Sequence, residues 1–299
     1  MNNITSTELI NRDTVDIDVV GTVDILTMIN NEDMKIAQAV QKCIPEIAKG
    51  VDIIVKNFVD KGRLIYVGAG TSGRLGVLDA SECPPTFSTS PEMVRGVIAG
   101  GDRALREAIE GAEDSEELAK KDFDSLDICD HDTIVGISAC GNAKYVVRFL
   151  EIAKLKKCKV ILITSNEEAK AKAFADCFIC VKTGAEAITG STRMKAGTAQ
   201  KMVLNMLSTA AMVKIGKTYH NLMIDVKPTN DKLKRRAITI VTEISGCKSA
   251  YAQKVLENFN YKIKHSVLHI MYGLTYEEAQ TILNQYNGVL RLAFDHLHK

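Results

Sequence analysis

The spacing of apolar residues changes along the chain and predicts helices towards both ends. Between Thr22 and Lys61, apolar side chains recur at three- and four-residue intervals, which predicts two or three helices separated near Asn31 and Pro45. Residues 1–20 are mainly polar and are expected to form an arm. Helical spacing returns after Asp231. The segments predicted to be helical there are 231–244, 248–258, 261–271 and 275–297, the last broken near Gly288.

Between these regions, short apolar runs alternate with helical patterns. The runs are Arg63–Val67, Val94–Ala99, Thr133–Ile137, Lys159–Thr164 and Cys177–Lys182. Strands that alternate with helices predict a parallel sheet covered by helices on both faces. We therefore expect an α/β domain over residues 62–230, an arm and helices packed on it over 1–61, and a small helical domain over 231–299.

Polar loops follow several of the predicted strands, where ligands of parallel sheets bind. The turn Gly68–Arg74 contains glycines, which let the backbone bend sharply, and it precedes a helix whose first N–H groups attract anions. Taken alone, this turn fits a plain strand-to-helix connection equally well. Its G-x-G-x-x-G spacing also resembles a dinucleotide fingerprint, but the acidic residue that such a site requires is missing.

Two further loops resemble the first in composition. One starts at Ser138, and the other precedes a long helix predicted over Ala199–Lys214. Three such loops favour one phosphate pocket over coincidence. The candidate binding residues are Gly70, Thr71, Ser72, Gly73, Ser138, Gly141, Asn142, Ser191, Thr192 and Lys195.

Two acidic segments supply candidate proton-transfer groups. Pro84 and Pro85 are predicted to end the preceding helix just after Glu82, and Gly111 is predicted to break the helix before Glu113. Carboxyls close to a bound sugar phosphate can act as general acid and base. Either glutamate alone is more often a solvated turn residue, because charged side chains are mostly exposed.

These segments closely resemble the N-acetylmuramic acid 6-phosphate etherase family. The resemblance spans residues 4–297, and its longest motifs are Tyr66–Gly76, Asp79–Pro85, Ile98–Gly101, Glu110–Ser115, Gly190–Lys201 and Asn221–Val226. It implies the sugar isomerase (SIS) fold, which is a flavodoxin-like α/β domain, with a small C-terminal helical domain and a homodimeric assembly. It also implies a carbon–oxygen lyase that converts N-acetylmuramic acid 6-phosphate and water to N-acetylglucosamine 6-phosphate and D-lactate, in the recycling or use of cell-wall muramic acid.

The resemblance further implies that Glu82 and Glu113 are the catalytic residues. Once the sugar ring opens, the C2 proton is acidic, so a base can remove it while an acid protonates the departing lactate oxygen; water then adds at C3. This chemistry needs no metal and no other cofactor. We expect Glu82 to protonate lactate and Glu113 to handle the C2 proton or the ring oxygen. A carboxyl that donates a proton near neutral pH needs a raised pKa, most simply through burial.

The second phosphate loop departs from the family pattern, which usually reads Ser-Ala-Ser-Gly-Arg-Thr. This chain has Cys140, Asn142 and Ala143 where that pattern has serine, arginine and threonine. Each lost bond to phosphate would cost about 1.5–3 kcal/mol if nothing compensated. Ser138, backbone N–H groups and Lys144 are candidates for compensation. We expect the departure to affect affinity or substrate choice and not the reaction class.

Composition excludes several classes of partner. With 38 Lys and Arg against 37 Asp and Glu, the net charge of +1 gives no strong field to attract nucleic acid or an anionic membrane. The longest apolar runs are far shorter than the roughly 20 residues of a membrane helix, and Met1–Asp13 contains no apolar signal core. We therefore expect a cytoplasmic protein.

The cysteines and two histidines are expected to be structural. Cys177 and Cys180 form a C-x-x-C without the second pair that a zinc site requires, and they lie in a predicted buried strand. His265 and His269 share one face of a predicted helix but lack an H-E-x-x-H pattern. No metal site is predicted.

Two other functions remain as alternatives. An SIS-type aldose–ketose isomerase would share the fold and pocket, but Glu82 before the proline pair favours the etherase. A non-enzymatic sugar-phosphate regulator is expected to carry a second SIS domain, for which 299 residues leave little room. A DNA-binding regulator would need a basic helix-turn-helix, and the N-terminal helices carry too few Lys and Arg for one.

Overall fold

The computed structural model describes residues 6–298, which form two compact units. The first contains the described residues of Met1–Ser81 together with Pro91–Ser208. The second contains Glu82–Ser90 and the described residues of Thr209–Lys299. Each unit therefore draws on two separate stretches of chain.

A five-stranded parallel sheet forms the centre of the first unit, in the order β2-β1-β3-β4-β5. This is the strand order of flavodoxin-like folds, so the predicted fold class is confirmed. Every residue of β1 and β3 is buried, which explains why these strands read as continuous apolar runs. The strands are β1 (Leu64–Gly68), β2 (Val94–Ile98), β3 (Thr133–Ile137), β4 (Lys159–Thr164) and β5 (Cys177–Cys180).

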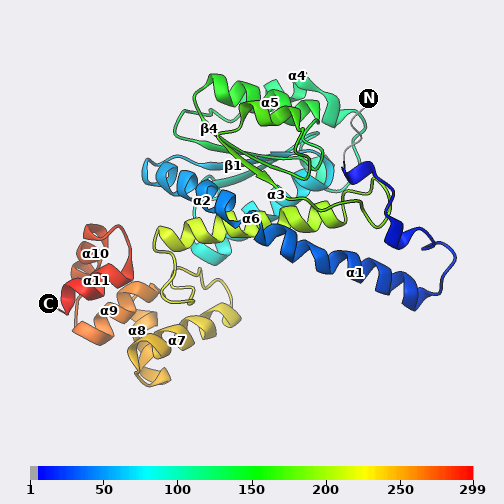
Figure 1. Cartoon of the computed structure of the whole chain (residues 1–299). Coiled ribbons are helices and arrows are strands. Elements are labelled where there is room, and N and C mark those ends of the chain that lie inside the picture. The colour runs from blue at the N-terminus through cyan, green and yellow to red at the C-terminus, as the bar shows by residue number, and fades with distance from the viewer. Residues whose placement is uncertain (1–5, 299) are drawn as a thin grey trace. The chain divides into compact units, whose positions relative to one another are not determined.

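Helices cover both faces of this sheet. Figure 1 shows α4 and α5 on one face, and α2, α3 and α6 on the other. Gly136 lets α5 approach β3 closely, because a Cβ atom there would lie 2.6 Å from the Leu150 side chain. The helices are α1 (Thr22–Gln41), α2 (Ile44–Val59), α3 (Gly70–Phe87), α4 (Glu116–Asp124), α5 (Lys144–Leu155) and α6 (Lys195–Lys214).

The N-terminal arm packs against the segment that leads into α6. Asn11 Nδ2 donates to the Ala185 carbonyl at 3.3 Å, and Thr14 Oγ1 donates to the Ala187 carbonyl at 2.8 Å. Both side chains are buried. Residues 6–20 of the predicted polar arm are thus held by hydrogen bonds made by polar side chains, whereas residues 1–5 lie outside the described residues.

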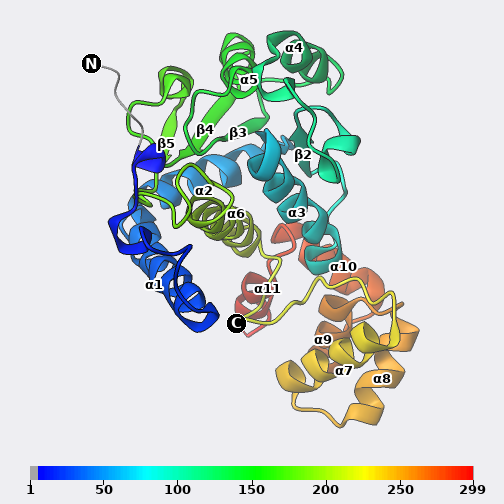
Figure 2. The same cartoon turned by 90° about the vertical axis from the view of Figure 1, so that its right-hand side faces the viewer.

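Helices make up most of the second unit. They close over an apolar core that includes Ile240, Val267 and Phe294, and the four predicted segments are confirmed, with the last divided at Gly288. No described helix is long and apolar enough to span a membrane. Figure 2 shows the helices of the second unit in another view. They are α7 (Asp231–Ser245), α8 (Ser249–Asn258), α9 (Ile263–Tyr272), α10 (Tyr276–Gln285) and α11 (Leu290–Leu297).

Four details of the predicted elements are wrong. The separation predicted near Asn31 is absent, because α1 continues through this residue to Gln41; only the separation near Pro45 is found. Helix α3 does not stop after Glu82 but runs through both prolines to Phe87. Proline has a helical φ, and near a C-terminus it removes only hydrogen bonds of the last turns. Helix α6 begins at Lys195, one turn earlier than predicted, because a distant carboxylate caps it. A short 3-10 turn, Asp102–Leu105, stands where a helix was predicted before Gly111.

Candidate active site

The turn between β1 and α3 has the geometry of an anion site. A Cβ atom on Gly68 would lie 2.7 Å from the Gly73 nitrogen, and one on Gly73 would lie 2.6 Å from the Ile98 side chain. Gly70, which is exposed, has a φ of +52° that disfavours other residues. The first N–H groups of α3 have no intrahelical acceptor, so they are available to a ligand beyond the strand end.

A cavity of about 200 Å³ joins this turn to the predicted acid–base segment. Its walls include Gly70 and Arg74 on one side and Glu110, Gly111 and Glu113 on the other. The structure thus brings one of the two catalytic candidates to the glycine turn, although the two lie far apart in sequence. Gly111 makes the bend possible, because its φ is +73°.

Arg74 connects the two walls of the cavity. Its Nε donates to the Leu105 carbonyl at 3.2 Å and its Nη2 donates to the Glu107 carbonyl at 3.0 Å. The guanidinium therefore holds the segment before Glu113 against the first turn of α3. The sequence contained this arginine beside the glycine turn, but nothing in the pattern indicated what it would contact.

The hydroxyl of Ser72 contacts a residue that sequence analysis missed. Ser72 Oγ donates to Gln200 Oε1 at 2.9 Å, and both side chains are buried. Thr71, its half-buried neighbour, lies against α6, because a Cβ atom on Gly197 would be 3.5 Å from Thr71 Cγ2. The first turns of α3 and α6 are therefore in contact below the glycine turn.

The second predicted loop is tightly folded. Ser138 is buried and its Oγ accepts a hydrogen bond from the Gly141 N–H at 3.0 Å. Gly141 has a φ of +68°, and a Cβ atom there would collide with Ala169 at 2.3 Å. The side chain of Asn142 accepts from the Lys170 N–H at 2.9 Å, so it supports the loop itself.

The third loop leads into a helix start that an internal carboxylate already occupies. The Glu186 carboxylate accepts the N–H groups of Lys195 at 2.8 Å and Ala196 at 3.0 Å, and it is fully buried. Ser191 and Thr192 are half-buried in the turn just before. No local pattern identifies Glu186 as a cap, because it stands nine residues before the helix.

Lys195 points away from solvent and pairs with a buried residue of α1. Its Nζ lies 2.5 Å from Glu32 Oε2, and both side chains are almost completely buried. Burial alone would raise the pKa of Glu32, but hydrogen bonds from Lys195, Lys35 and Asn11 outweigh it and lower that pKa to about 2. Lys195 would reach a phosphate only if this ion pair opened.

Glu82 and Glu113 belong to different units of the structure. Glu82 is an exposed residue of α3 and is grouped with the second unit, whereas Glu113 is exposed in the first. Neither shows the burial expected of a proton donor. Asp79, one turn before Glu82, is by contrast buried, and it accepts hydrogen bonds from Tyr66 at 2.8 Å and Asn205 at 2.7 Å.

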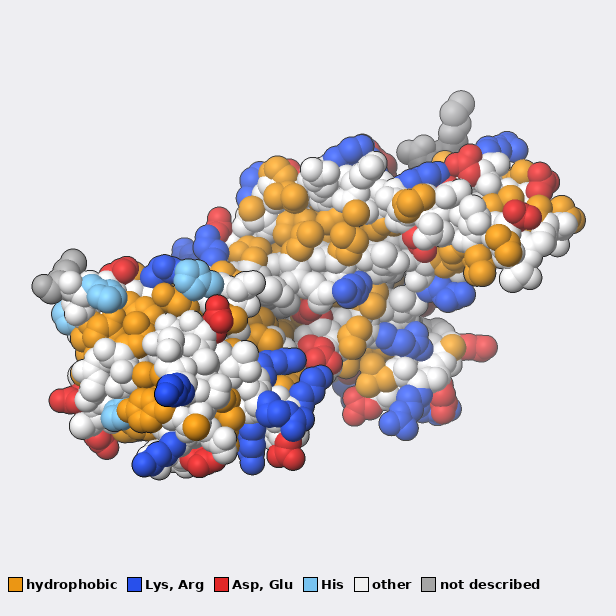
Figure 3. Space-filling view, turned by 90° about the horizontal axis from the view of Figure 1, so that it is seen from below, with side chains coloured by type: hydrophobic (Ala, Val, Ile, Leu, Met, Phe, Trp, Pro, Cys, Tyr) orange, Lys and Arg blue, Asp and Glu red, His pale blue; other side chains and the backbone are white. Residues whose placement is uncertain are grey.

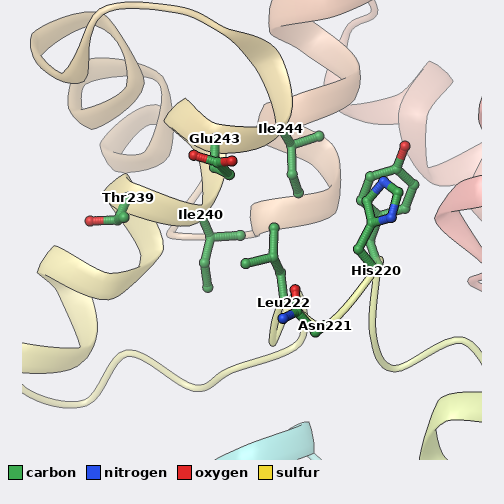
Figure 4. Close-up of a pocket in the computed structure, with 8 residues that line it drawn as sticks. His220, Asn221, Leu222, Thr239, Ile240, Glu243 and Ile244 are labelled. Carbon is green, nitrogen blue, oxygen red and sulfur yellow. The ribbon is translucent and has the colours of Figure 1, made fainter.

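A second hollow of about 590 Å³ lies within the helical unit. Figure 4 shows Ile240 and Ile244 of α7 pointing towards Leu222, with Asn221 and Glu243 at its edge. Asn221 and Leu222 begin the motif Asn221–Val226, so a segment that resembles the etherase family forms one wall.

The C-x-x-C pair and His265 are largely enclosed by neighbouring side chains. Burial raises the pKa of Cys177 and that of Cys180 to about 11, so both thiols stay protonated at neutral pH. His265 is buried and stacks on Tyr276. Among the described residues, no group of three or more His, Cys, Asp or Glu could hold a metal ion.

Comparison with curated proteins identifies the family. The chain is 51% identical over 284 residues to the N-acetylmuramic acid 6-phosphate etherase of Clostridium botulinum (strain Okra / Type B1), covering 95% of this chain and 94% of that protein. It is 47% identical over 293 residues to the etherase of the same name from Bacillus subtilis (strain 168), covering 98% and 96%. The chain belongs to the N-acetylmuramic acid 6-phosphate etherase family. The resemblance noted in the sequence is confirmed.

Domain models place SIS and lid regions within this etherase family member. Residues 46–154 match the N-terminal SIS domain of glucokinase regulatory protein, 117–210 match the SIS domain, and 220–280 match the C-terminal lid domain of glucokinase regulatory protein. The phosphoheptose isomerase from Neisseria gonorrhoeae has a TM-score of 0.51 at 16% identity, covering 64% of this chain and 98% of that one. That likeness supports the fold alone.

Proposed function

We propose that this protein cleaves the lactyl ether of N-acetylmuramic acid 6-phosphate, giving N-acetylglucosamine 6-phosphate and D-lactate for the recycling of cell-wall amino sugar. One observation supports this most directly: Glu113 and the glycine turn line the same small cavity. An anion site beside a carboxyl is what proton transfer on a phosphosugar requires. Membership of the etherase family favours this reaction over aldose–ketose isomerisation.

The phosphate would bind where the backbone offers free donors. We propose that the turn Gly70–Gly73 holds it through the N–H groups of Gly70, Thr71 and Ser72, because the Gly73 N–H already donates to the Ala69 carbonyl at 3.3 Å. The side chains of Thr71 and Ser72, Ser138 and the second loop would assist. The N-terminus of α6 is a weaker candidate, because Glu186 already accepts its N–H groups at 2.8 and 3.0 Å. Ser191 and Thr192 would then act from the neighbouring turn, and Lys195 would contribute only if its ion pair with Glu32 opened.

Elimination would follow from the open-chain sugar. A base takes the C2 proton, the C–H electrons form the C2–C3 double bond, and the C3–O bond breaks. The departing lactate oxygen takes a proton from an acid. Water then adds its oxygen to C3 and a proton to C2. We propose Glu82 as the acid for lactate and Glu113 as the group that handles the C2 proton or the ring oxygen.

We also propose a cytoplasmic homodimer. Helix α1 exposes a series of large apolar side chains, with Val23 at 76% and Leu26 at 62% exposed. Figure 3 shows hydrophobic side chains on the surface of the part of the first unit that contains α1. Pairing of two copies across these side chains would bury them.

The proposed activity can be tested by one product. The protein is incubated with N-acetylmuramic acid 6-phosphate, and D-lactate is measured with a stereospecific dehydrogenase. We expect stoichiometric release of D-lactate and N-acetylglucosamine 6-phosphate, with incorporation of oxygen from labelled water at C3. Unphosphorylated N-acetylmuramic acid should react far more slowly. Conversion of aldose to ketose phosphates without lactate would instead favour the isomerase.

A further inference from the structure

A buried donor without a partner lies next to the glycine turn. The side chain of Gln200, on the second turn of α6, is 2% exposed. Its Oε1 accepts the Ser72 hydroxyl at 2.9 Å, whereas its Nε2 has no hydrogen-bond partner among the described residues. Orphaned N–H groups are rare in protein interiors, because they lose their bonds to water and gain none in return.

The position of this donor relates it to the proposed phosphate site. Ser72 belongs to the first turn of α3, whose N–H groups face the space beyond β1. Gln200 is too deeply buried for a ligand to touch it directly. Any influence of Gln200 on a bound phosphate would therefore pass through the hydroxyl of Ser72.

The number of protons on Ser72 limits what it can do. A serine hydroxyl has one proton, and here that proton goes to Gln200 Oε1. While this bond persists, Ser72 Oγ can turn only its lone pairs towards a phosphate oxygen. The negative charge of that oxygen would be repelled by these lone pairs. Rotation of the carboxamide by 180° exchanges the two ends of the amide. Nε2 then donates to Ser72 Oγ, and the hydroxyl proton becomes available to the phosphate.

We propose that Gln200 is a positioning residue for the phosphosugar: its carboxamide turns over when phosphate binds, donates to Ser72 and thereby directs the Ser72 proton to a phosphate oxygen. The rotation gives the orphaned N–H a partner. It leaves Oε1 with unused lone pairs, which proteins tolerate more readily than an orphaned donor. This inference rests on the proposed function, because it assumes that a sugar phosphate binds at Gly70–Gly73.

Two substitutions of Gln200 separate this role from simple packing. Gln200→Glu keeps the shape, but its carboxylate only accepts, so it retains the Ser72 proton. Gln200→Met removes donor and acceptor together and leaves the Ser72 proton free. Calorimetry with N-acetylglucosamine 6-phosphate at pH 8 should show the Kd at least tenfold higher for the Glu variant, and within about threefold of the wild type for the Met variant. If Gln200 had only a packing role, the Kd should instead rise more for Gln200→Met than for Gln200→Glu.

A double-mutant cycle and a pH series refine the test. In a Ser72→Ala background, Gln200→Glu should cost at least threefold less than in the wild type, because no hydroxyl proton remains to be withheld. The ratio of the Kd of the Glu variant to that of the wild type should fall at pH 5.5, where a protonated carboxyl can donate to Ser72. Equal losses in both backgrounds would overturn the proposal.

A measurement on the wild type covers the case in which the Glu variant fails to fold. The Gln200 side-chain amide signals in a ¹⁵N spectrum, assigned by their loss in Gln200→Met, should shift with N-acetylglucosamine 6-phosphate and stay unchanged with N-acetylglucosamine. If N-acetylglucosamine 6-phosphate binds without that shift, the positioning role of Gln200 is refuted but the proposed function is not. Failure of the wild type to bind N-acetylglucosamine 6-phosphate would instead refute the proposed function on which it rests.

Discussion

The ammonium group of Lys195 lies 2.5 Å from the carboxylate of Glu32, and neither side chain is more than 3% exposed. This ion pair joins the middle of α1 to the first residue of α6. Few other side chains of α1 are buried; those within the helix are Ile36 and Val40. The pair therefore makes a large part of the attachment of α1 to the rest of its unit.

Stability should fall in acid as this pair is lost. The pKa of Glu32 is lowered in the folded protein to about 2 from its usual 4.5, so its contribution is complete above pH 4.5 and disappears as the pH falls from there towards 2. The shift corresponds to a free energy of unfolding of about 3 kcal/mol. Urea unfolding at pH 6, 4 and 3 would measure it.

Substitution of one partner provides the control for that titration. Lys195→Met leaves Glu32 charged and buried without its main partner, so we expect a loss of about 3–5 kcal/mol at pH 7. The double variant Lys195→Met/Glu32→Gln removes both charges and should recover part of this loss. If Lys195→Met is as stable as the wild type at pH 7, the ion pair does not hold α1.

The two catalytic candidates should give different phenotypes. Glu82→Gln should reduce lactate release by about 10²–10⁴-fold, because the departing oxygen loses its proton donor. If Glu82 serves only lactate, this variant should still exchange the C2 hydrogen with deuterated water, which mass spectrometry detects. Glu113→Gln should slow both exchange and release. If the Glu113 variant exchanges the C2 hydrogen and the Glu82 variant does not, the two roles are the reverse of those proposed. Near-normal lactate release by both variants would place the active site elsewhere.

The second phosphate loop offers a substitution that should improve binding. Cys140→Ser restores a hydroxyl beside the buried Ser138, at a position where the etherase family usually has serine. We expect the KM for N-acetylmuramic acid 6-phosphate to fall severalfold, towards the tenfold that one contact of ~1.4 kcal/mol would give. Steady-state kinetics would measure it, with Cys129→Ser, at an exposed free cysteine, as the matched control. An unchanged KM would mean that residue 140 does not face the phosphate.

Self-association should depend on α1. Sedimentation of the wild type at micromolar concentration should show a species of about twice the 32.7 kDa chain mass. Leu26→Asp, at a residue 62% exposed in the structure, should dissociate it without lowering the unfolding temperature greatly. Leu155→Asp, at a residue 77% exposed on α5, is the control. A wild type that sediments at about 33 kDa alone would contradict the homodimer.

The strands and most helices could be predicted because their signals are local. Continuous apolar runs marked β1 and β3, and Gly246 and Gly273 end α7 and α9 with positive φ, as glycine after a helix commonly does. The start of α6 could not be found in this way. Its cap, Glu186, reaches the helix through a fold of the chain that apolar spacing does not encode.

The residues of the candidate site could be predicted from the sequence, but the contacts that hold their side chains could not. The polar loops indicated Ser72 and Lys195, and the family resemblance indicated Glu113. The residues that contact Ser72 and Lys195, however, stand far from them in sequence. Gln200 reaches Ser72 across 128 residues, and Glu32 reaches Lys195 across 163. Such contacts depend on the packing of α1 and α6 against the core, which only the folded chain shows.

The second unit is built from two stretches of chain, and this limits how the protein can be divided. Helices α3 and α6 each begin in the first unit and end in the second. The short stretch Glu82–Ser90 contributes the buried side chains of Cys83 and Phe87. A fragment that stops at Ser208 would keep this stretch but lose the helices with which it is grouped, so a single cut cannot release either unit whole. Limited proteolysis of the native protein would thus yield nicked chains that remain associated, rather than two independent domains.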